Sequence, residues 1–217
     1  MDDLALDQPV LYQTLRELDF INETLGGNAI SINAFNRQTK KERDITVMDM
    51  GTGSGKLLRK MSIHSRQAGI KFRGIGIDAN PYVANYAREH TSPSYSIQYA
   101  DHDVLDEACY QEEIDIIHAC LFTHHFSDEQ LIWLFKKWKE TAKKAVIIND
   151  LYRNTIAYYS IKWLTQFFSK SSMVKYDAPL SVARGFKRKE LEEILTKAGI
   201  EDYQLKWKWA FRWLLVF

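Results

Sequence analysis

Hydrophobic positions recur with two different periods along the chain, and the change of period divides it in two. From Leu11 to Leu25, apolar residues recur every three or four positions, which predicts a helix with one apolar stripe. From residue 45 onward, short apolar runs alternate with longer helical stretches, an order typical of a parallel sheet covered by helices on both faces. We therefore expect a helical cap and linker over residues 1–44, followed by one α/β domain over residues 45–217.

Several strands and helix ends can be located within the second part. Five apolar runs predict strands: Ile45–Met50, Phe72–Ile77, Tyr95–Ala100, Ile114–Phe122 and Ala145–Ile148. Asn80-Pro81 is suited to begin a helix, and Ser127 with Gln130 forms a capping box that begins another. A last helix, over about residues 187–198, ends at Gly199, which suits a left-handed C-cap.

The final stretch, Tyr203–Phe217, places aromatic and aliphatic residues on one parity and basic residues on the other. This alternation predicts two further strands joined by a turn near Ala210. Aromatic residues interleaved with basic ones also occur in proteins that bind single-stranded nucleic acid. In an α/β chain, alternation at strand spacing favours packing of these aromatic residues, including Trp207 and Trp209, in the core.

A long connection, residues 151–186, interrupts the regular alternation between the fifth strand and the last helix. Its first half is rich in aromatic and apolar residues, which predicts a helix over Ile156–Phe168 followed by an irregular stretch through Asp177–Pro179. Connections of this length usually carry a function or a structure of their own. We expect this insertion and the N-terminal helices to cover the strand ends as a cap.

Three glycines on alternate positions, Gly51, Gly53 and Gly55, follow the first predicted strand. Glycine has no Cβ atom, so this loop can bend sharply and let a ligand approach its backbone. A dinucleotide fingerprint would place its third glycine at Lys56, and a phosphate-binding P-loop would have four residues between its glycines rather than three. The next strand ends in Asp78, a carboxylate placed to bind a ribose diol. The loop and the acid together predict a nucleoside-binding crevice at the ends of two neighbouring strands.

This order of strand, glycine triplet, second strand and terminal acid resembles motif I of the class I S-adenosylmethionine (SAM)-dependent methyltransferases, with Asp49 in the acidic position. The resemblance implies an enzyme with a Rossmann-like seven-stranded α/β sheet, mostly parallel with the last strand antiparallel. It implies SAM as the cofactor and S-adenosylhomocysteine (SAH) as its product. It also implies cofactor contacts after four of the strands, from Asp49, Gly51, Thr52, Gly53, Asp78, Ala79, Asp101, His102, Asp103, Val104, Cys120 and Leu121.

Some of these assignments have a competing interpretation. Asp103 matches the residue that receives the adenine amino group in the resembling family, and Asp101 is the competing choice. Both can equally be solvated residues of a turn. Asp49 can satisfy amides of the loop and reach the cofactor only indirectly. The spacing alone leaves these alternatives open.

Two adjacent histidines, His124 and His125, directly follow the fourth predicted strand at the rim of the expected crevice. Histidine ordinarily titrates in the range that suits it to accept a phenolic proton, but paired histidines here can also brace the strand end. His124 and His125 are the candidate catalytic residues, although the bracing interpretation is favoured for the pair; of the two, His124 suits the base better and His125 the brace. We interpret His118 as an ordinary strand residue. Adjacent histidines point apart and no third ligand is in register, so no metal is expected.

Residues around the expected mouth are candidates for binding an aromatic substrate, or for simple packing: Tyr12, Tyr152, Arg153, Tyr158 and Tyr159. The segments 149–153, 156–164 and 177–186 resemble a bacterial subgroup of methyltransferases that often accompanies type III polyketide synthases. That resemblance implies methylation of phenolic or quinone-like products of secondary metabolism. Relatives in the subgroup often have histidine after Asn-Asp-Leu, where this chain has Tyr152.

These features favour methyl transfer from SAM to a hydroxyl oxygen of a small, fairly apolar aromatic metabolite. Three alternatives stay open at this point. The enzyme could methylate carbon of a similar molecule, it could methylate RNA or protein, or the chain could bind SAM without catalysis.

Composition narrows the class of partner. The 217 residues are 46% hydrophobic and 26% charged, and the net charge is +1, so no basic bias points to nucleic acid. Cys109 and Cys120 have no metal-ligand spacing and indicate no disulfide framework. The acidic start does not resemble a secretion signal, and no apolar run is long enough to span a membrane. We expect a cytoplasmic protein, monomeric or homodimeric, whose partner is a small-molecule substrate.

Overall fold

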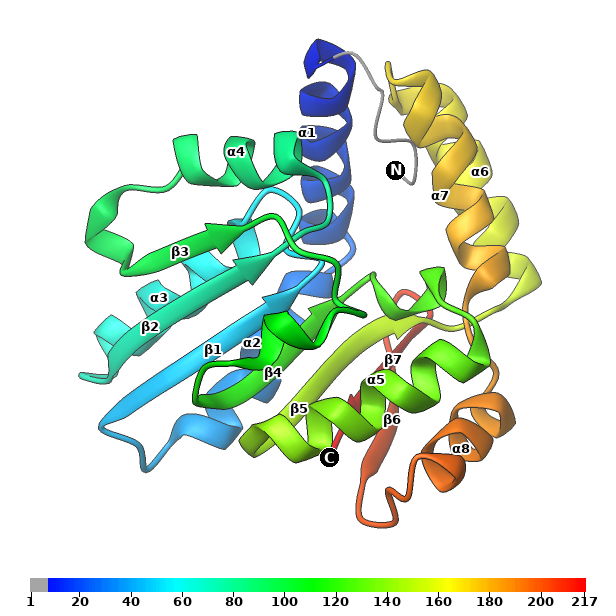
Figure 1. Cartoon of the computed structure of the whole chain (residues 1–217). Helices are drawn as coiled ribbons and strands as arrows, with labels where there is room; N and C mark the ends of the chain where they lie inside the picture. The colour runs from blue at the N-terminus through cyan, green and yellow to red at the C-terminus, as the bar shows by residue number, and fades with distance from the viewer. Residues whose placement is uncertain (1–7) are drawn as a thin grey trace.

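A seven-stranded sheet forms the centre of the molecule (Figure 1). The computed structural model describes residues 8–217. The strands are β1 (Asp44–Met50), β2 (Lys71–Ile77), β3 (Ile97–Ala100), β4 (Ile114–Cys120), β5 (Ala142–Leu151), β6 (Gln204–Lys208) and β7 (Arg212–Val216). Their order is β3-β2-β1-β4-β5-β7-β6; the first five pair in parallel, and β7 is antiparallel to both of its neighbours. The predicted Rossmann-like sheet with an antiparallel last strand is confirmed.

The strand order reverses at β1, which lies between β2 and β4. The chain passes outward from β1 to β2 and β3, then returns to continue with β4 on the other side. In open α/β sheets, ligands bind at such a switch point, outside the carboxyl ends of the strands. Met50 is paired with Ala119, so the loops after β1 and β4 begin side by side. The glycine loop, residues 51–55, therefore lies at the switch point.

Helices cover both faces of the sheet. They are α1 (Gln8–Thr24), α2 (Gly27–Thr39), α3 (Lys56–Gln67), α4 (Pro81–Glu89), α5 (Asp128–Thr141), α6 (Thr155–Phe168), α7 (Ser172–Arg184) and α8 (Arg188–Lys197). On one face, α2, α3 and α4 contribute Phe35, Leu58 and Ala87 to the core. On the other face, α5 and α8 contribute Phe135 and Leu195.

The helix ends that the sequence signals are confirmed. The side chain of Asn80 accepts a hydrogen bond from the backbone N–H of Tyr82 at the start of α4. Ser127 and Gln130 form the capping box of α5. Gly199 follows α8 with a φ of 70°.

Three helices, α1, α6 and α7, stand beyond the carboxyl ends of the strands (Figure 1). Hydrogen bonds join α1 to the turn between the other two. Glu17 accepts from the backbone N–H of Lys170 (3.2 Å) and Ser171 (3.4 Å), and from the Ser169 hydroxyl. The hydroxyls of Thr14 and Ser171 are 2.9 Å apart. These three helices form the cover of the strand ends, whereas α2 packs on the face of the sheet against β5 and β7.

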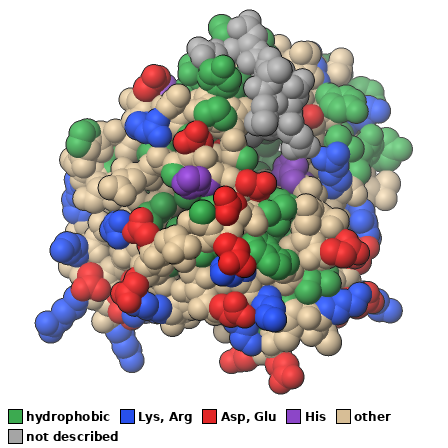
Figure 2. Space-filling view, in the orientation of Figure 1, with side chains coloured by type: hydrophobic (Ala, Val, Ile, Leu, Met, Phe, Trp, Pro, Cys, Tyr) green, Lys and Arg blue, Asp and Glu red, His purple; other side chains and the backbone are tan. Residues whose placement is uncertain are grey.

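The outer face of α6 exposes large apolar side chains, namely Ile156, Tyr159, Trp163, Phe167 and Phe168. Figure 2 shows hydrophobic side chains gathered at the upper right, over α6 and α7. The buried residues of α6 are Ala157 and Thr165, so the helix is held by its opposite face. Within the described part of the chain, no helix combines the length and the hydropathy needed to cross a membrane.

The second half of the insertion is helical, and the expectation of an irregular stretch through Asp177–Pro179 is wrong. α7 runs through these residues with Pro179 inside it. Proline removes one backbone donor and usually kinks a helix. Here Val174, Pro179 and Val182 are all buried, and Ser171 accepts from the Val174 N–H (3.3 Å) at the helix start. Tertiary packing and a good cap outweigh the local signal of the proline.

The two final strands are present, but not all of their aromatic residues are buried in the core as predicted. Trp213 is buried as expected, whereas Trp207 is 49% exposed and Trp209 is 72% exposed. Trp207 lies on β6, which is an edge strand, and Trp209 lies in the turn, so neither has a full layer of chain over it. The turn near Ala210 is confirmed, with a φ of 59° at that residue.

Candidate active site

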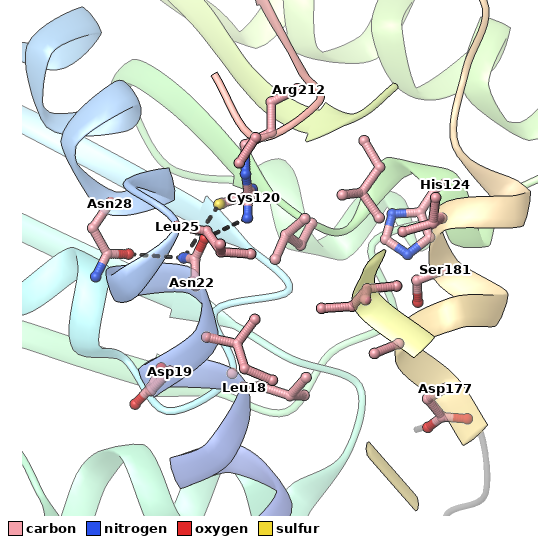
Figure 3. Close-up of a pocket in the computed structure, with 18 of the residues that line it drawn as sticks. Leu18, Asp19, Asn22, Leu25, Asn28, Cys120, His124, Asp177, Ser181 and Arg212 are labelled. Atoms are coloured by element: carbon pink, nitrogen blue, oxygen red, sulfur yellow. Dashed lines mark hydrogen bonds between the residues drawn. The ribbon is translucent and has the colours of Figure 1, made fainter. Parts of the chain in front are cut away.

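A cavity of about 490 Å³ lies between the strand ends and the cover made by α1, α6 and α7 (Figure 3). Asp49 and residues 51–54 line it from the end of β1, and residues 120–121 with both adjacent histidines line it from the end of β4. The turn before β7 forms a further part of the wall, over residues 209–212. The cavity thus brings together segments that are far apart in the sequence.

The glycine loop presents bare backbone to this cavity. Gly51, Gly53 and Gly55 all have positive φ, at 64°, 55° and 73°. A Cβ atom added at Gly51 would lie 2.1 Å from the Phe122 ring. A Cβ atom added at Gly53 would meet only Leu15, at 4.0 Å, so that side of the loop is open. The loop therefore has both the backbone conformation and the free space that a closely approaching ligand requires.

Asp49 is held in a buried network below the loop. Its carboxylate accepts from the Thr52 hydroxyl (2.9 Å) and from Nδ1 of His118 (2.7 Å). Nε2 of His118 is 3.0 Å from the Ser31 hydroxyl, which in turn accepts from Asn149 Nδ2 at 3.0 Å. The network ties β1, β4 and β5 to α2 and orients the start of the loop. His118 is therefore more than the ordinary strand residue that we expected.

Asp78 connects the end of β2 to the glycine loop. One carboxylate oxygen accepts from the backbone N–H of Gly53, and the other accepts from that of Asn80, each at 3.1 Å. Burial raises the pKa of Asp78 to about 6, although the two hydrogen bonds act in the opposite direction. The carboxylate thus supports the loop residue whose far side is open to the cavity.

Asp78 lies outside the cavity lining. So do the other residues predicted to contact the adenosine, namely Ala79, Asp101, His102, Asp103 and Val104. Asp101, His102 and Asp103 are exposed. Asp103 accepts from the backbone N–H of Leu105 (2.9 Å), as a turn residue does. Val104 is buried in the core. The structure places this part of the predicted site beyond the glycine loop, at the ends of β2 and β3.

His124 is buried at the cavity wall and is paired with Asp150, near the end of β5. Its Nδ1 is 2.7 Å from one carboxylate oxygen. The other oxygen accepts from the Thr123 hydroxyl (2.6 Å) and from the backbone N–H of Phe122 and His124 (3.2 Å each). Burial would raise the pKa of Asp150, but His124 and the other donors outweigh it and hold the pKa well below its usual value.

The ionised Asp150 can only accept, so Nδ1 of His124 is the donor. Nε2 of His124 is buried and has no hydrogen-bond partner among residues 8–217, and the residue lines the cavity. An imidazole held in this way can take a proton at Nε2. His124 therefore braces the strand end and is also the candidate base. His125 is exposed and lines the cavity as well.

Cys120 lines the cavity beside these residues, and burial raises the pKa of its thiol to about 11. It is therefore protonated at neutral pH and is unsuited to be a nucleophile. Among residues 8–217, no group of three or more His, Cys, Asp or Glu side chains is arranged to hold a metal ion.

The five predicted substrate residues all lie outside the cavity lining. The Tyr12 ring contacts Tyr86, Tyr152 contacts Trp213, and Arg153 forms an ion pair with Glu190. Tyr158 and Tyr159 contact each other. α6 instead turns Ala157, Ile161 and Leu164 toward the cavity. These positions share one helix face, from which the two tyrosines are rotated away.

Sequence reasoning missed three buried or half-buried polar residues at the site: His118, Asp19 and Arg212. Asp19 lines the cavity, accepts from the Ser54 hydroxyl (2.7 Å), and has its pKa raised by burial. Arg212 lines the cavity and is only 2% exposed. A lone histidine within an apolar strand, and a basic residue between Phe211 and Trp213, were the available signals.

The family model described as "Methyltransferase domain" matches residues 29–205. Because the match covers most of the chain, the protein belongs to this methyltransferase domain family. Comparison with curated proteins gave no match.

Solved methyltransferase structures share the fold. Plantazolicin methyltransferase BpumL, solved with SAH, has a TM-score of 0.65 and 20% identity, over 88% of this chain and 72% of that chain. Human N-acetylserotonin methyltransferase, solved with SAM, has a TM-score of 0.61 and 16% identity, over 94% and 55%. A candidate O-methyltransferase from Nostoc punctiforme PCC 73102 has a TM-score of 0.63 and 16% identity, over 88% and 56%. This chain thus spans just over half the length of the last two.

Proposed function

We propose that the protein is a SAM-dependent methyltransferase that transfers a methyl group to a hydroxyl oxygen of a small aromatic metabolite, phenolic or quinone-like. Membership of the methyltransferase domain family supports the reaction class. When bound, SAM supplies a methyl group made electrophilic by its sulfonium. The open backbone at Gly53 and the cavity beside it fit a ligand that lies against the loop. We assign cofactor binding to the glycine loop, Asp49 and Asp78, and to residues 120–121.

The observation that carries the hydroxyl assignment is the unpartnered Nε2 of His124. A hydroxyl must lose its proton when its oxygen is methylated, and a nearby base makes that oxygen a better nucleophile. Asp150 holds the imidazole in the tautomer that leaves Nε2 free to accept the proton. His124 lines the same cavity as the glycine loop, so an acceptor bound there can lie between the base and a cofactor held by the loop.

The shape and lining of the cavity support a small, fairly apolar acceptor. Its volume of about 490 Å³ lies in the range of small-molecule pockets. Leu18, Ile161, Leu164 and Val182 face it from α1, α6 and α7. These helices keep water from the reacting atoms and hold the acceptor in line, which supplies much of the acceleration in a simple displacement.

Incubation with SAM and a panel of phenols, alkylresorcinols and quinols tests the proposal. We expect at least one hydroxylated aromatic compound to gain the mass of one methylene group, measured by mass spectrometry. The NMR spectrum of the product should show that the new methyl group is attached to oxygen. Methylation of carbon in the same compounds, or of RNA or protein alone, would contradict the hydroxyl assignment.

A further inference from the structure

Arg212, the first residue of β7, is a buried cation that forms no ion pair with any residue the structure describes. It lines the cavity and is 2% exposed. Its Nη2 donates to the Asn22 side-chain oxygen at 2.8 Å. Its Nε and Nη1 have no hydrogen-bond partner among the described residues. A buried guanidinium is costly unless an opposite charge and hydrogen bonds compensate it, so this arrangement calls for an anion that the chain itself does not supply.

The nearby carboxylates are committed elsewhere. Asp49 accepts from His118 and Thr52, and Asp150 accepts from His124 and from donors around the end of β4. Neither forms an ion pair with Arg212 in the described part of the chain. Among residues 8–217, the guanidinium at the start of β7 therefore has no direct ion-pair partner.

The N-terminus of α2 adds to this positive charge. A Cβ atom at Gly27, the first residue of α2, would lie 2.8 Å from Arg212 Cζ, so the guanidinium packs directly on the helix start. Gly26 precedes it with a φ of 76° and has no side chain to cap the helix, and the first turn contains no acidic residue. Unpaired N–H groups at a helix start attract anions. Arg212 and the helix start thus attract an anion to the same place.

We propose that Arg212, oriented by Asn22, and the N-terminus of α2 form a carboxylate-binding site in the cavity wall. The planar guanidinium matches a carboxylate with two parallel N–H donors. The site rests on the proposed function, in which two ligands can supply that group: the methionine tail of the cofactor or a carboxylate on the acceptor. Figure 3 shows Arg212, Asn22 and Cys120 on one side of the cavity, with His124, Ser181 and Asp177 on the other. This placement, beside the end of β4 and away from the candidate base, favours the methionine tail.

Calorimetric titration with two ligands tests the site without relying on activity. SAH carries the amino-acid tail, and 5′-methylthioadenosine has the same adenosine and thioether without it. We expect Arg212→Gln to weaken SAH binding about 10- to 100-fold, the usual range for a lost charged hydrogen-bonding partner, and to change 5′-methylthioadenosine binding less than about twofold. Arg37→Gln, which removes an exposed guanidinium from the other end of α2, should change neither affinity.

A third ligand, benzoate, separates the two sources of the carboxylate. If Arg212→Gln leaves SAH binding intact but abolishes benzoate binding, the site stands and receives the acceptor. If SAH and 5′-methylthioadenosine weaken equally, or if none of the three ligands responds, the carboxylate site is overturned. Wild-type protein that binds neither SAH nor 5′-methylthioadenosine would instead contradict the proposed function.

Because Arg212 is buried, the Arg212→Gln variant can fail to fold. A second experiment therefore tests the site in the wild-type protein. Acetate added at increasing concentration should weaken the binding of SAH, or of benzoate, while 5′-methylthioadenosine binding stays constant. If acetate at constant ionic strength had no such selective effect, the proposed carboxylate site would be overturned. Arg212→Lys, which keeps the charge but not the fork of donors, should recover part of the selective affinity.

Discussion

Two histidine–aspartate pairs lie in neighbouring parts of the sheet, and they differ at one nitrogen. In His118–Asp49 and in His124–Asp150, Nδ1 is 2.7 Å from a carboxylate oxygen, and all four residues are buried. Ser31 satisfies Nε2 of His118, whereas Nε2 of His124 has no partner in the described part of the chain and the residue lines the cavity. A histidine–aspartate contact therefore says little about catalysis by itself. The second nitrogen separates a pair that supports the loop from a pair that can accept a proton.

Replacing His124 should have the largest effect on turnover. We expect His124→Ala to lower kcat by about 10² to 10⁴, the usual contribution of a positioned base, with SAH affinity unchanged within about twofold. Asp150 keeps the Thr123 hydroxyl and backbone donors, which limits the loss of stability. Steady-state kinetics and calorimetry check this, with His125→Ala as the matched variant. A kcat that falls no more than that of His125→Ala would remove His124 as the base.

Replacing His118 should do the opposite, lowering stability more than it slows the chemical step. His118→Ala leaves Asp49 buried with one oxygen unpaired, which we expect to cost about 3 kcal/mol in the free energy of unfolding. Chemical denaturation measures this loss. His64→Ala on α3 is the control and should change stability by less than about 0.5 kcal/mol. If His118→Ala were fully stable yet inactive, the comparison between the two pairs would be reversed.

Asp78 is a third carboxylate near the site and, unlike Asp49 and Asp150, it is not paired with a histidine of the described chain. Because its pKa is raised to about 6, we expect SAH affinity to increase as the pH rises through that value and the carboxylate ionises. Asp78→Asn should bind SAH about tenfold more weakly and lose this pH dependence. Calorimetry between pH 5 and 8, spanning about one pH unit or more on either side of the pKa, would show both effects. Equal affinity and the same pH profile in the variant would contradict the ribose assignment.

The same shift predicts a pH effect on stability. Between pH 3.8 and about pH 6, the carboxyl group of Asp78 keeps its proton in the folded chain but has lost it in the unfolded chain. Its contribution to the free energy of unfolding therefore falls as the pH rises through this window. Denaturation curves of wild type and Asp78→Asn should converge at low pH and separate above it, with the variant relatively more stable.

The smallest effect should come from loosening the cover above the candidate base. Glu17→Gln removes the charge that three donors at the turn between α6 and α7 share. We expect a loss of about 1 kcal/mol in stability and an increase of a few-fold in the acceptor KM, with SAH affinity unchanged. Glu192→Gln, which breaks an exposed ion pair on α8, is the control. A parallel loss of SAH affinity would mean that α1 supports the cofactor rather than the acceptor.

Features that depend on neighbouring residues could be predicted from the sequence. The glycines of residues 51–55, the cap at Asn80 and the apolar strands act within a few positions of one another. The seven-stranded, mostly parallel sheet with an antiparallel last strand followed from the resemblance to a known family. The position of His124 and His125 at the cavity was also predicted, because they closely follow a buried strand.

Features that depend on distant residues could not be predicted. Asp49 meets His118 only because β1 and β4 pair in that register. Whether Tyr158 or Ile161 faces the cavity depends on the rotation of α6, which its packing against α7 decides. The partner of Arg212 comes from the other end of the chain. Each of these required the assembled fold.

Calorimetric titration of wild-type protein with SAH tests the central claim, that the bare backbone of the glycine loop and its adjoining cavity bind this cofactor. We predict saturable binding of one SAH per chain, retained in His124→Ala and weakened in Asp78→Asn. Absence of heat with SAH and with SAM, together with saturable binding of NAD or ATP, would contradict the account.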